Sequence, residues 1–385
     1  MSLALIDARL VDGTGAAPRD GVVVTIKNGC IASVGDAPPP GAETLDVKGR
    51  TLLPGLVDAH VHLSSLDVEA PPDVEEYALA DAARRMLEAG ITTVRDLGSY
   101  GRSLFRLRDA IRLALCPGPR LVLCGKVIAA TCPGARAFPG MYREADGADE
   151  LRKAVREQVR EGADLVKVMA TGALTVAEDI EPAQLSRREL DAVVAEAHRL
   201  GYRVAAHAEG LEGIRLSVEA GVDTLEHGEL GFRAPEVLAA MAERAIVLVP
   251  TLSVFDFVAE SDRFPAWMRE RAKELGESAR KTVEAARHEG VALAMGADAP
   301  PHGANGRELV RLVEAGLSPM EGIVAGTSAA ARASGLEHEI GTVEPGKVAD
   351  LLVVDGDPLA DIRVLCDRDR ILLVFQAGDI IVHRQ

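Results

Sequence analysis

A chain of 385 residues can hold one large α/β barrel with a small attached domain, or two or three domains of average size. Its 48% of hydrophobic residues are enough for a large buried core, and its 26% of charged residues exclude a low-complexity chain. Only 3% of the residues are aromatic, and 43 basic against 59 acidic residues give a net charge of −16, which argues against nucleic acid and anionic membranes as partners.

The two ends of the chain are expected to form short β-strands. In GVVVTIKNGCIASVG, near the N-terminus, apolar and polar residues alternate and Gly marks the turns. KVADLLVVDGD and RILLVFQAGD, near the C-terminus, have the same texture. We therefore predict one small β domain that is assembled from residues 1–54 and 341–385. The N-terminus lacks a basic segment followed by a long apolar one, and no apolar run reaches the roughly 20 residues of a membrane span, so we expect a cytoplasmic protein.

Residues 55–340 alternate between short runs rich in β-branched residues and amphipathic helical stretches such as ELRKAVREQVREGA. The candidate strands cover residues 55–63, 91–98, 120–125, 164–172, 202–210, 222–228, 245–251 and 291–299. Eight strands, each followed by a helix, are the repeat of a (β/α)₈ TIM barrel, in which helices cover the outside of parallel strands. An open, doubly wound sheet is the alternative, and the count of eight favours the barrel.

Unusual polar residues stand toward the ends of five of the eight candidate strands. They are His60 and His62 on the first strand, Lys167 on the fourth, His207 on the fifth, His227 on the sixth and Asp298 on the eighth. The active site of such a barrel is built at the C-terminal ends of its strands. A random scatter of nine histidines would not place four of them in this way.

The two histidines of the first candidate strand are suited to hold a metal ion. His60 and His62 are two residues apart, so their side chains point to the same face of the strand. An isolated HxH is weak evidence, but this one follows a Pro-Gly turn and an apolar strand in PGLVDAHVHL. Together with the other histidines and Asp298 at the same end of one barrel, it predicts a metal site.

Lys167 is an unusual residue for a strand, because Val166 and Val168 flank it. It either pairs with an acidic neighbour such as Asp298 or extends toward the mouth of the barrel. Beside metal cations a charged ammonium would be strongly disfavoured, so the lysine would be neutral or chemically modified. A modified lysine that carries a carboxylate would bridge two cations well.

Five motifs in this order, HVH, VKVMATG, AAHAEG, LEHG and GADAP, resemble the amidohydrolase superfamily. GTVEPGKVADLLVVDGDPLADI is similar to the C-terminal β-sandwich of that superfamily, so the resemblance covers essentially the whole chain. It is strongest to the branch of imidazolonepropionase-like proteins and binuclear Xaa-Pro dipeptidases. The expected architecture is therefore a TIM barrel over residues 55–340 and a β-sandwich formed from both termini.

The resemblance implies two divalent metal ions, usually Zn²⁺, held by six side chains. His60 and His62 would hold the first ion, His207 and His227 the second, Lys167 would bridge them after carboxylation by CO₂, and Asp298 would ligate the first. A hydroxide between the ions would attack an amide bond of a small substrate, such as a dipeptide or an N-acyl amino acid. Asp298 would act as general base and then as general acid.

Two loops depart from the dipeptidase-like pattern and put peptide specificity in doubt. Residues 130–140, ATCPGARAFPG, lack the Gly-Gly-His segment of those relatives, and Phe255 and Phe257 stand where a tyrosine is common. Arg136 could pair with a substrate carboxylate, or be an ordinary exposed loop residue. His302, in DAPPHG, could reach the pocket or be a solvated loop residue.

Two other functions stay open at this point. A mononuclear relative, such as a deaminase or a hydrolase of cyclic amides or lactones, would not need Lys167. A non-catalytic binding protein that kept the barrel would tend to have lost ligands, whereas all six positions are present. The sequence leaves a homo-oligomer open.

Overall fold

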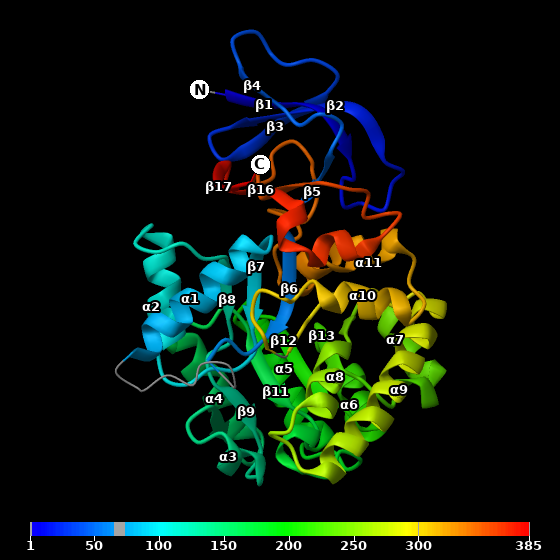
Figure 1. Ribbon diagram of the computed structural model, residues 1–385. Helices are drawn as coiled ribbons and strands as arrows, with labels where there is room; N and C mark the ends of the chain where they lie inside the picture. The colour runs from blue at the N-terminus through cyan, green and yellow to red at the C-terminus, as the bar shows by residue number, and fades with distance from the viewer. Residues whose placement is uncertain (1, 65–73, 299, 385) are drawn as a thin grey trace.

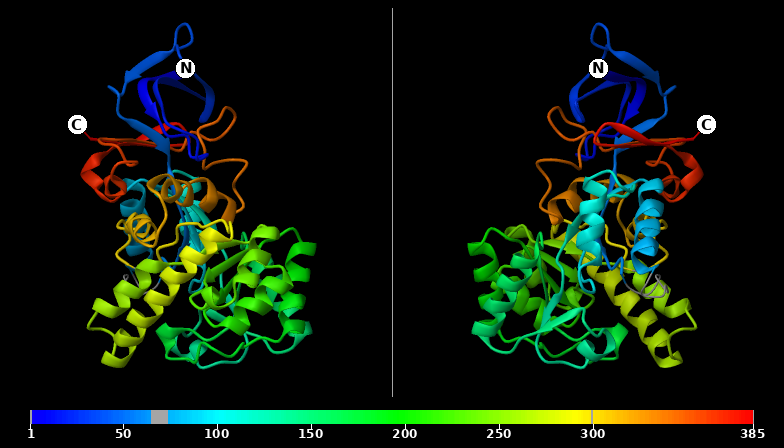
Figure 2. Two further views of the ribbon diagram at one scale, coloured as in Figure 1. Left: turned by 90° about the vertical axis from the view of Figure 1, so that its right-hand side faces the viewer. Right: turned by 90° about the vertical axis from the view of Figure 1, so that its left-hand side faces the viewer.

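The computed structural model describes residues 2–64, 74–298 and 300–384. Both ends of the chain contribute to one sheet of eight strands, which lies at one end of the molecule (Figures 1 and 2). Its strands are β1 (Ser2–Leu10), β2 (Arg19–Lys27), β3 (Cys30–Gly35), β4 (Glu43–Asp46), β5 (Thr51–Pro54), β15 (Leu351–Val354), β16 (Ile371–Gln376) and β17 (Asp379–His383). The strand order is β17-β16-β15-β5-β1-β2-β3, and β4 also pairs with β1.

Alternating apolar residues hold this sheet together. Val22, Val24 and Ile26 are two residues apart on β2, so they point to the same face, where Leu5 and Phe375 belong to the same buried cluster. The antiparallel pair β5–β15 joins the N-terminal strands to the C-terminal ones. The prediction that both ends share one β unit agrees with this pairing.

Nine strands of the middle segment are paired in parallel. They are β6 (Leu56–Val61), β7 (Ile91–Asp96), β8 (Arg120–Leu123), β9 (Val127–Ala129), β10 (Tyr142–Glu144), β11 (Val166–Met169), β12 (Val204–Ala208), β13 (Thr224–His227) and β14 (Val247–Val249). They form one group ordered β6-β7-β8 and another ordered β10-β9-β11-β12-β13-β14. The predicted α/β class with parallel strands is confirmed; β9 and β10 were not predicted.

The predicted strand over residues 291–299 is wrong as a regular strand. In the described part of this segment only Leu293 forms a bridge, with Leu248 of β14. The backbone is extended far enough to bond both neighbours, since Ala294 N donates to Leu248 O and Ala59 N of β6 donates to Met295 O. The regular ladder is interrupted because Met295 N donates to Ala325 O and Ala297 N donates to the side chain of Asp58. Asp298 then has a φ of 53°, in the left-handed region.

Helices surround the parallel strands (Figure 1). They are α1 (Glu75–Glu88), α2 (Ser103–Arg112), α3 (Gly134–Ala137), α4 (Ala148–Glu161), α5 (Arg187–Arg199), α6 (Leu211–Ala220), α7 (Pro235–Glu243), α8 (Leu252–Glu260), α9 (Ala266–His288), α10 (Arg307–Glu314), α11 (Pro319–Ala325) and α12 (Ser328–Ala333), with short 3₁₀ turns η2 (Leu174–Val176), η3 (Gly231–Arg233), η4 (Ile362–Cys366) and η5 (Arg368–Arg370). On α4, Leu151, Ala154 and Val155 are buried at helical spacing, and Gly162 ends the helix with a φ of 96°.

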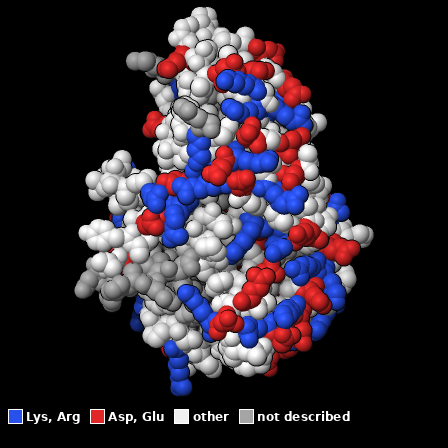
Figure 3. Space-filling view, in the orientation of Figure 1, with Lys and Arg blue, Asp and Glu red and all other residues white. Residues whose placement is uncertain are grey.

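The outer faces of the helices are charged. Basic and acidic side chains are interspersed on the face shown in Figure 3, and many form ion pairs one helical turn apart, such as Arg271–Glu274 on α9 and Arg311–Glu314 on α10. Within the part of the chain that the structure describes, none of the helices combines the length and apolar character needed to cross a membrane.

Residues 292–298, which hydrogen-bond to both β14 and β6, are named the 292–298 segment. Substitution of Gly296 by Ala tests the close contact between this segment and β6. A Cβ at this position would lie 2.7 Å from His60 Cβ and would also clash with Val249 of β14. We expect Gly296→Ala to lower the free energy of unfolding by about 1–3 kcal/mol, measured by denaturant titration. Gly35→Ala, where nothing lies within 4 Å, is the matched control. Equal stability of the two variants would contradict the packing described.

Candidate active site

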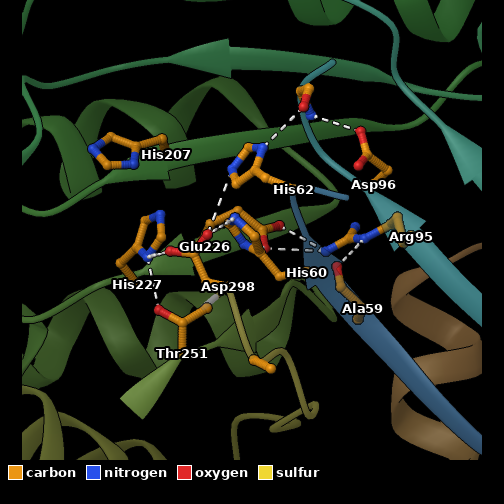
Figure 4. A network of polar contacts seen from close by, with 12 residues as sticks. Ala59, His60, His62, Arg95, Asp96, His207, Glu226, His227, Thr251 and Asp298 are labelled. Carbon is orange, nitrogen blue, oxygen red and sulfur yellow. Dashed lines mark hydrogen bonds and ion pairs between the residues drawn. The ribbon is translucent and has the colours of Figure 1, made fainter. Parts of the chain in front are cut away.

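Four imidazole rings come together at the C-terminal ends of the parallel strands (Figure 4). His60 lies in β6, His62 directly follows it, His207 lies in β12 and His227 ends β13. The ring centroid of His60 lies 5.4 Å from that of His62 and 4.9 Å from that of His227. Those of His207 and His227 are 4.5 Å apart. The fold therefore places all four predicted histidines in one cluster.

Asp298 and Lys167 belong to the same cluster. Asp298 Oδ1 is 3.4 Å from His60 Nε2 and 3.5 Å from His62 Nε2, and Oδ2 is 3.9 Å from His227 Nδ1. Lys167, on β11, is only 2% exposed, and its Nζ has no hydrogen-bond partner among the described residues. The alternative that Lys167 pairs with Asp298 is therefore not what the structure contains.

Protein acceptors fix the proton positions on the first two rings. His60 Nδ1 lies 2.8 Å from a carboxylate oxygen of Glu226, and His62 Nδ1 lies 3.0 Å from the carbonyl oxygen of Gly98. A ring nitrogen that donates to such an acceptor carries the proton, so Nε2 keeps its lone pair. Both Nε2 atoms face Asp298, which makes them available as ligands.

The other two rings are held in a similar way. His207 Nε2 lies 3.1 Å from the carbonyl oxygen of Gly172, and His227 Nδ1 lies 2.8 Å from the hydroxyl oxygen of Thr251. The proton of His207 is thus on Nε2, and its Nδ1 is left with a lone pair. Partners of this kind orient histidines that ligate metals.

Three residues of the site have a left-handed backbone. His227, Thr251 and Asp298 have φ values of 71°, 49° and 53°. Non-glycine residues seldom adopt this region, and a β-branched residue such as threonine does so at a cost. His227 ends β13, Thr251 lies two residues after the end of β14, and Asp298 follows the stretch that bonds to β14 and β6. The chain therefore leaves the sheet close to where these side chains meet.

A buried ion pair supports His60 from behind. Arg95 Nη2 of β7 lies 2.9 and 3.1 Å from the two carboxylate oxygens of Glu226, and both side chains are fully buried. Arg95 also donates to the carbonyl oxygen of Ala59 (Figure 4). A further hydrogen bond goes from Arg95 Nη1 to the hydroxyl of Thr224. Sequence analysis missed both charged residues, although each stands inside an apolar strand, which was the available signal.

Burial keeps the histidines neutral. It lowers the pKa of His62 to about 4 and that of His207 to about 3, and it lowers the pKa values of His60 and His227 well below the usual range. Burial also lowers the pKa of Lys167 and raises that of Asp298. Neutral imidazoles with free lone pairs are what a divalent metal ion requires.

A cavity opens beside this cluster. His62, Lys167, His207, His227 and Asp298 line it on one side. The remaining lining is mostly apolar and includes Phe138, Met141, Val254, Phe255, Phe257 and Phe264. Two buried carboxylates that sequence analysis missed, those of Glu209 and Glu229, also line it. Pockets with apolar walls and a few polar groups are typical of small-molecule sites.

The two predicted substrate contacts do not line this cavity. Arg136 lies exposed on α3, beside a separate surface depression that also includes Thr131 and Glu144. His302 is buried, not a solvated loop residue, and is not among the residues that line the cavity. Substrate binding by either residue stays a prediction.

A model of the amidohydrolase family matches residues 51–381. The chain belongs to the amidohydrolase family. The resemblance inferred from its motifs is thus confirmed.

This amidohydrolase is similar to proteins with several activities. It is 31% identical to an ochratoxinase of Aspergillus niger, over 96% of this chain and 85% of that protein. It is also 31% identical to an imidazolonepropionase of Rhizorhabdus wittichii, over 92% and 94%. A solved Xaa-Pro dipeptidase with bound methionine has a TM-score of 0.90 at 31% identity, over 99% of this chain and 100% of that one. These relationships make the chain a hydrolase that acts on carbon–nitrogen bonds.

The lowered pKa values of the buried histidines predict how the stability of the chelator-treated amidohydrolase depends on pH. The folded pKa of His207, about 3, lies below its usual 6.5, so its contribution to stability is full above pH 6.5 and is lost as the pH falls toward 3. We expect the free energy of unfolding of His207→Gln to fall less steeply over this window than that of the wild type. Denaturant titrations at a series of pH values measure this, with the exposed His288→Gln as control. Parallel curves for wild type and His207→Gln would refute the proposed burial effect.

Proposed function

We propose that this amidohydrolase is a binuclear metal-dependent hydrolase that cleaves an amide bond of a small substrate, such as a dipeptide or an N-acyl amino acid. The observation that carries the proposal is the convergence of four buried imidazoles with Asp298 and Lys167 in one cluster, of which every member except His60 lines the cavity. The activities of the ochratoxinase and the Xaa-Pro dipeptidase relatives, as their names give them, support a small amide as substrate.

The proposal includes a closed barrel over residues 55–340 and a β-sandwich domain from residues 1–54 and 341–385. A hydrogen bond from Asp164 N to Leu123 O joins the segment before β11 to β8. The hydrogen bond from Ala294 N to Leu248 O connects the 292–298 segment to β14. The one from Ala59 N to Met295 O connects the same segment to β6. The series of hydrogen-bonded neighbours thus begins at β6 and ends at β6, which supports a closed barrel of eight strands around one axis.

The donor set fits divalent metal ions. His60, His227 and Asp298 offer ligand atoms that all lie within 4.8 Å of one another, and His60 Nε2 is buried with no hydrogen-bond partner among the described residues. Imidazole and carboxylate ligands suit Zn²⁺. By the family resemblance, His60, His62 and Asp298 would hold one ion, and His207 and His227 the other.

Lys167 would join the two ions after its Nζ has reacted with CO₂ to form a carbamate, with release of a proton. Only the neutral amine can react in this way, and burial lowers the pKa of Lys167 toward that state. Lys167 lines the cavity, and no hydrogen bond to a described residue engages its Nζ. A carboxylate at this position would also offset the positive charge of two cations.

Asp298 would carry the proton in the reaction. When bound, two divalent ions polarise the scissile carbonyl and lower the pKa of a water molecule. The carboxylate of Asp298, with Oδ1 toward His60 and His62 and Oδ2 toward His227, is positioned to accept a proton from the attacking water. The protonated carboxyl group of Asp298 can then donate this proton to the leaving nitrogen.

One observation favours a second candidate. Within the described residues, His60, His227 and Asp298 are the three whose ligand atoms all lie within 4.8 Å of one another, and three such ligands would be enough for a single ion. A mononuclear deaminase or a hydrolase of cyclic amides or lactones would fit this smaller set. Its site would leave the buried amine of Lys167 without a role.

A substrate screen tests the proposed function. Zinc-loaded protein is incubated with libraries of dipeptides and N-acyl amino acids, together with cyclic amides, lactones and amino-substituted heterocycles. We expect hydrolysis of linear amides that is lost after treatment with a chelator. Activity confined to lactones, cyclic amides or deamination would support the mononuclear candidate instead.

Replacement of Asp298 by Asn tests its role in proton transfer. The amide keeps the size of the side chain but cannot accept the proton, so we expect kcat to fall by about 10²–10⁴-fold. The metal content, measured by mass spectrometry of the elements, should remain at one half or more of the wild-type value. Asp262→Asn, an exposed carboxylate 97% accessible, is the control. Undiminished turnover in Asp298→Asn would remove the residue from this role.

A further inference from the structure

Two buried glutamates line the cavity beside the histidine cluster. Glu209 follows β12 and Glu229 follows β13, and their exposed fractions are 5% and 1%. The two segments run side by side, because Gly228 N donates to Ala208 O and Leu230 N donates to Glu209 O. The cavity therefore has a second polar feature besides the proposed metal ligands.

Neither carboxylate is neutralised by a basic side chain of the lining. The single backbone N–H of Leu174 is shared between the two carboxylate oxygens of Glu209, each 3.3 Å from the nitrogen. Glu229 Oε2 is buried and has no hydrogen-bond partner among the described residues. The only lysine or arginine in the described lining is Lys167, which the proposed function assigns to the metal ions. Arg271 of α9 lies outside the lining and pairs with Glu274 at 2.8 Å.

An unpaired buried carboxylate destabilises the fold. Its burial is costly unless it has a charged or hydrogen-bonded partner. Natural chains break this rule mainly at functional sites, where the missing partner is a ligand. Glu229, with an unpartnered oxygen in a cavity, is such a position. The same lining includes Phe257 and Phe264, and aromatic rings also favour a nearby cation.

We propose that Glu209 and Glu229 form a subsite for a positively charged nitrogen group of the substrate. This inference rests on the proposed function and narrows it to amides that carry a protonated amine close to the scissile bond. The α-ammonium group of a dipeptide and the side-chain ammonium of a lysyl residue offer the same chemistry. Each could donate hydrogen bonds to both carboxylates while the apolar walls contact the attached carbon chain.

Glu209 Oε1 is also 3.5 Å from His207 Nε2, so a role in orienting that histidine is the competing explanation. The two roles differ in what they predict. An orienting glutamate affects metal content and all substrates equally, whereas a cation subsite affects only the charged substrates. The variants Glu209→Gln and Glu229→Gln keep the volume and remove the charge. Glu212→Gln, an exposed residue on α6, is the matched control.

The kinetic test compares pairs of substrates that differ by one positive charge. Lysyl-alanine is compared with norleucyl-alanine, alanyl-lysine with alanyl-norleucine, and norleucyl-alanine with its N-acetyl derivative. For zinc-loaded wild type we expect kcat/KM to be about 10–100-fold higher for the charged member of at least one pair. The pair that shows the preference identifies which ammonium group is bound. Both glutamine variants should lose the preference at unchanged zinc content.

A binding measurement separates this inference from the proposed function. Calorimetry of zinc-loaded protein with n-pentylammonium and with 1-pentanol should show tighter binding of the cation, which Glu229→Gln abolishes and Glu212→Gln does not. This result without hydrolysis of any amide would overturn the proposed function alone. Equal binding of both probes, equal kcat/KM within every pair, or a loss of zinc in the glutamine variants would overturn the subsite. The wild-type comparisons hold even if a variant fails to fold.

Discussion

The ion pair between Arg95 and Glu226 is the contact on which the site depends. Arg95 connects three parts of the chain, because it bonds Ala59 O on β6, Glu226 on β13 and Ala333 O on α12. Both charges are fully buried. Their burial is tolerated because all three nitrogens of the Arg95 guanidinium group, Nε, Nη1 and Nη2, donate hydrogen bonds to acceptors. Loss of either partner would leave an uncompensated charge in the centre of the parallel strands.

This pair also determines the state of the first imidazole. With its charge balanced by Arg95, Glu226 remains an acceptor for His60 Nδ1 at 2.8 Å. That bond fixes the tautomer, and Nε2 is turned toward Asp298 with its lone pair free. The carbonyl oxygens of Gly98 and Gly172 place the protons of His62 and His207 in the same way, and the hydroxyl of Thr251 holds the ring of His227. The rings are therefore oriented as the proposed metal ligands would need. Such pre-organisation is what metal sites and catalytic sites require of their surroundings.

The cavity is then left with an excess of acidic groups over basic ones. Asp298, Glu209 and Glu229 face it, and Lys167 is its one lysine in the described lining. Metal ions would balance the charge at the histidine end, and a cationic substrate would balance it at the glutamate end. Burial raises the pKa values of all three acids, so their charged forms depend on cations beside them. This dependence links the proposed metal centre with the proposed substrate class.

Sequence patterns predicted the parts of this protein that local periodicity determines. The spacing of HVH along a strand placed His60 and His62, and the repeat of strands and helices gave the α/β class. Glu226 could not be predicted as the partner of Arg95, because 131 residues separate them and only the folded topology brings them together. The stretch over residues 291–299 was predicted as a strand, but its irregularity could not be predicted. Its N–H groups bond to Ala325 O and to the side chain of Asp58, and both of these partners are distant in the sequence. Arg136 was chosen from a loop, and a loop position depends on contacts that no periodic pattern encodes.

The number of metal ions bound per chain tests the central claim most directly. Purified protein is loaded with Zn²⁺ in the presence and absence of bicarbonate, and its zinc content is measured for the wild type and for Lys167→Ala. The account predicts about two zinc ions per wild-type chain with bicarbonate, fewer without it, and a loss of the bicarbonate effect in Lys167→Ala. One zinc ion per chain, unchanged by bicarbonate and by the loss of Lys167, would contradict it.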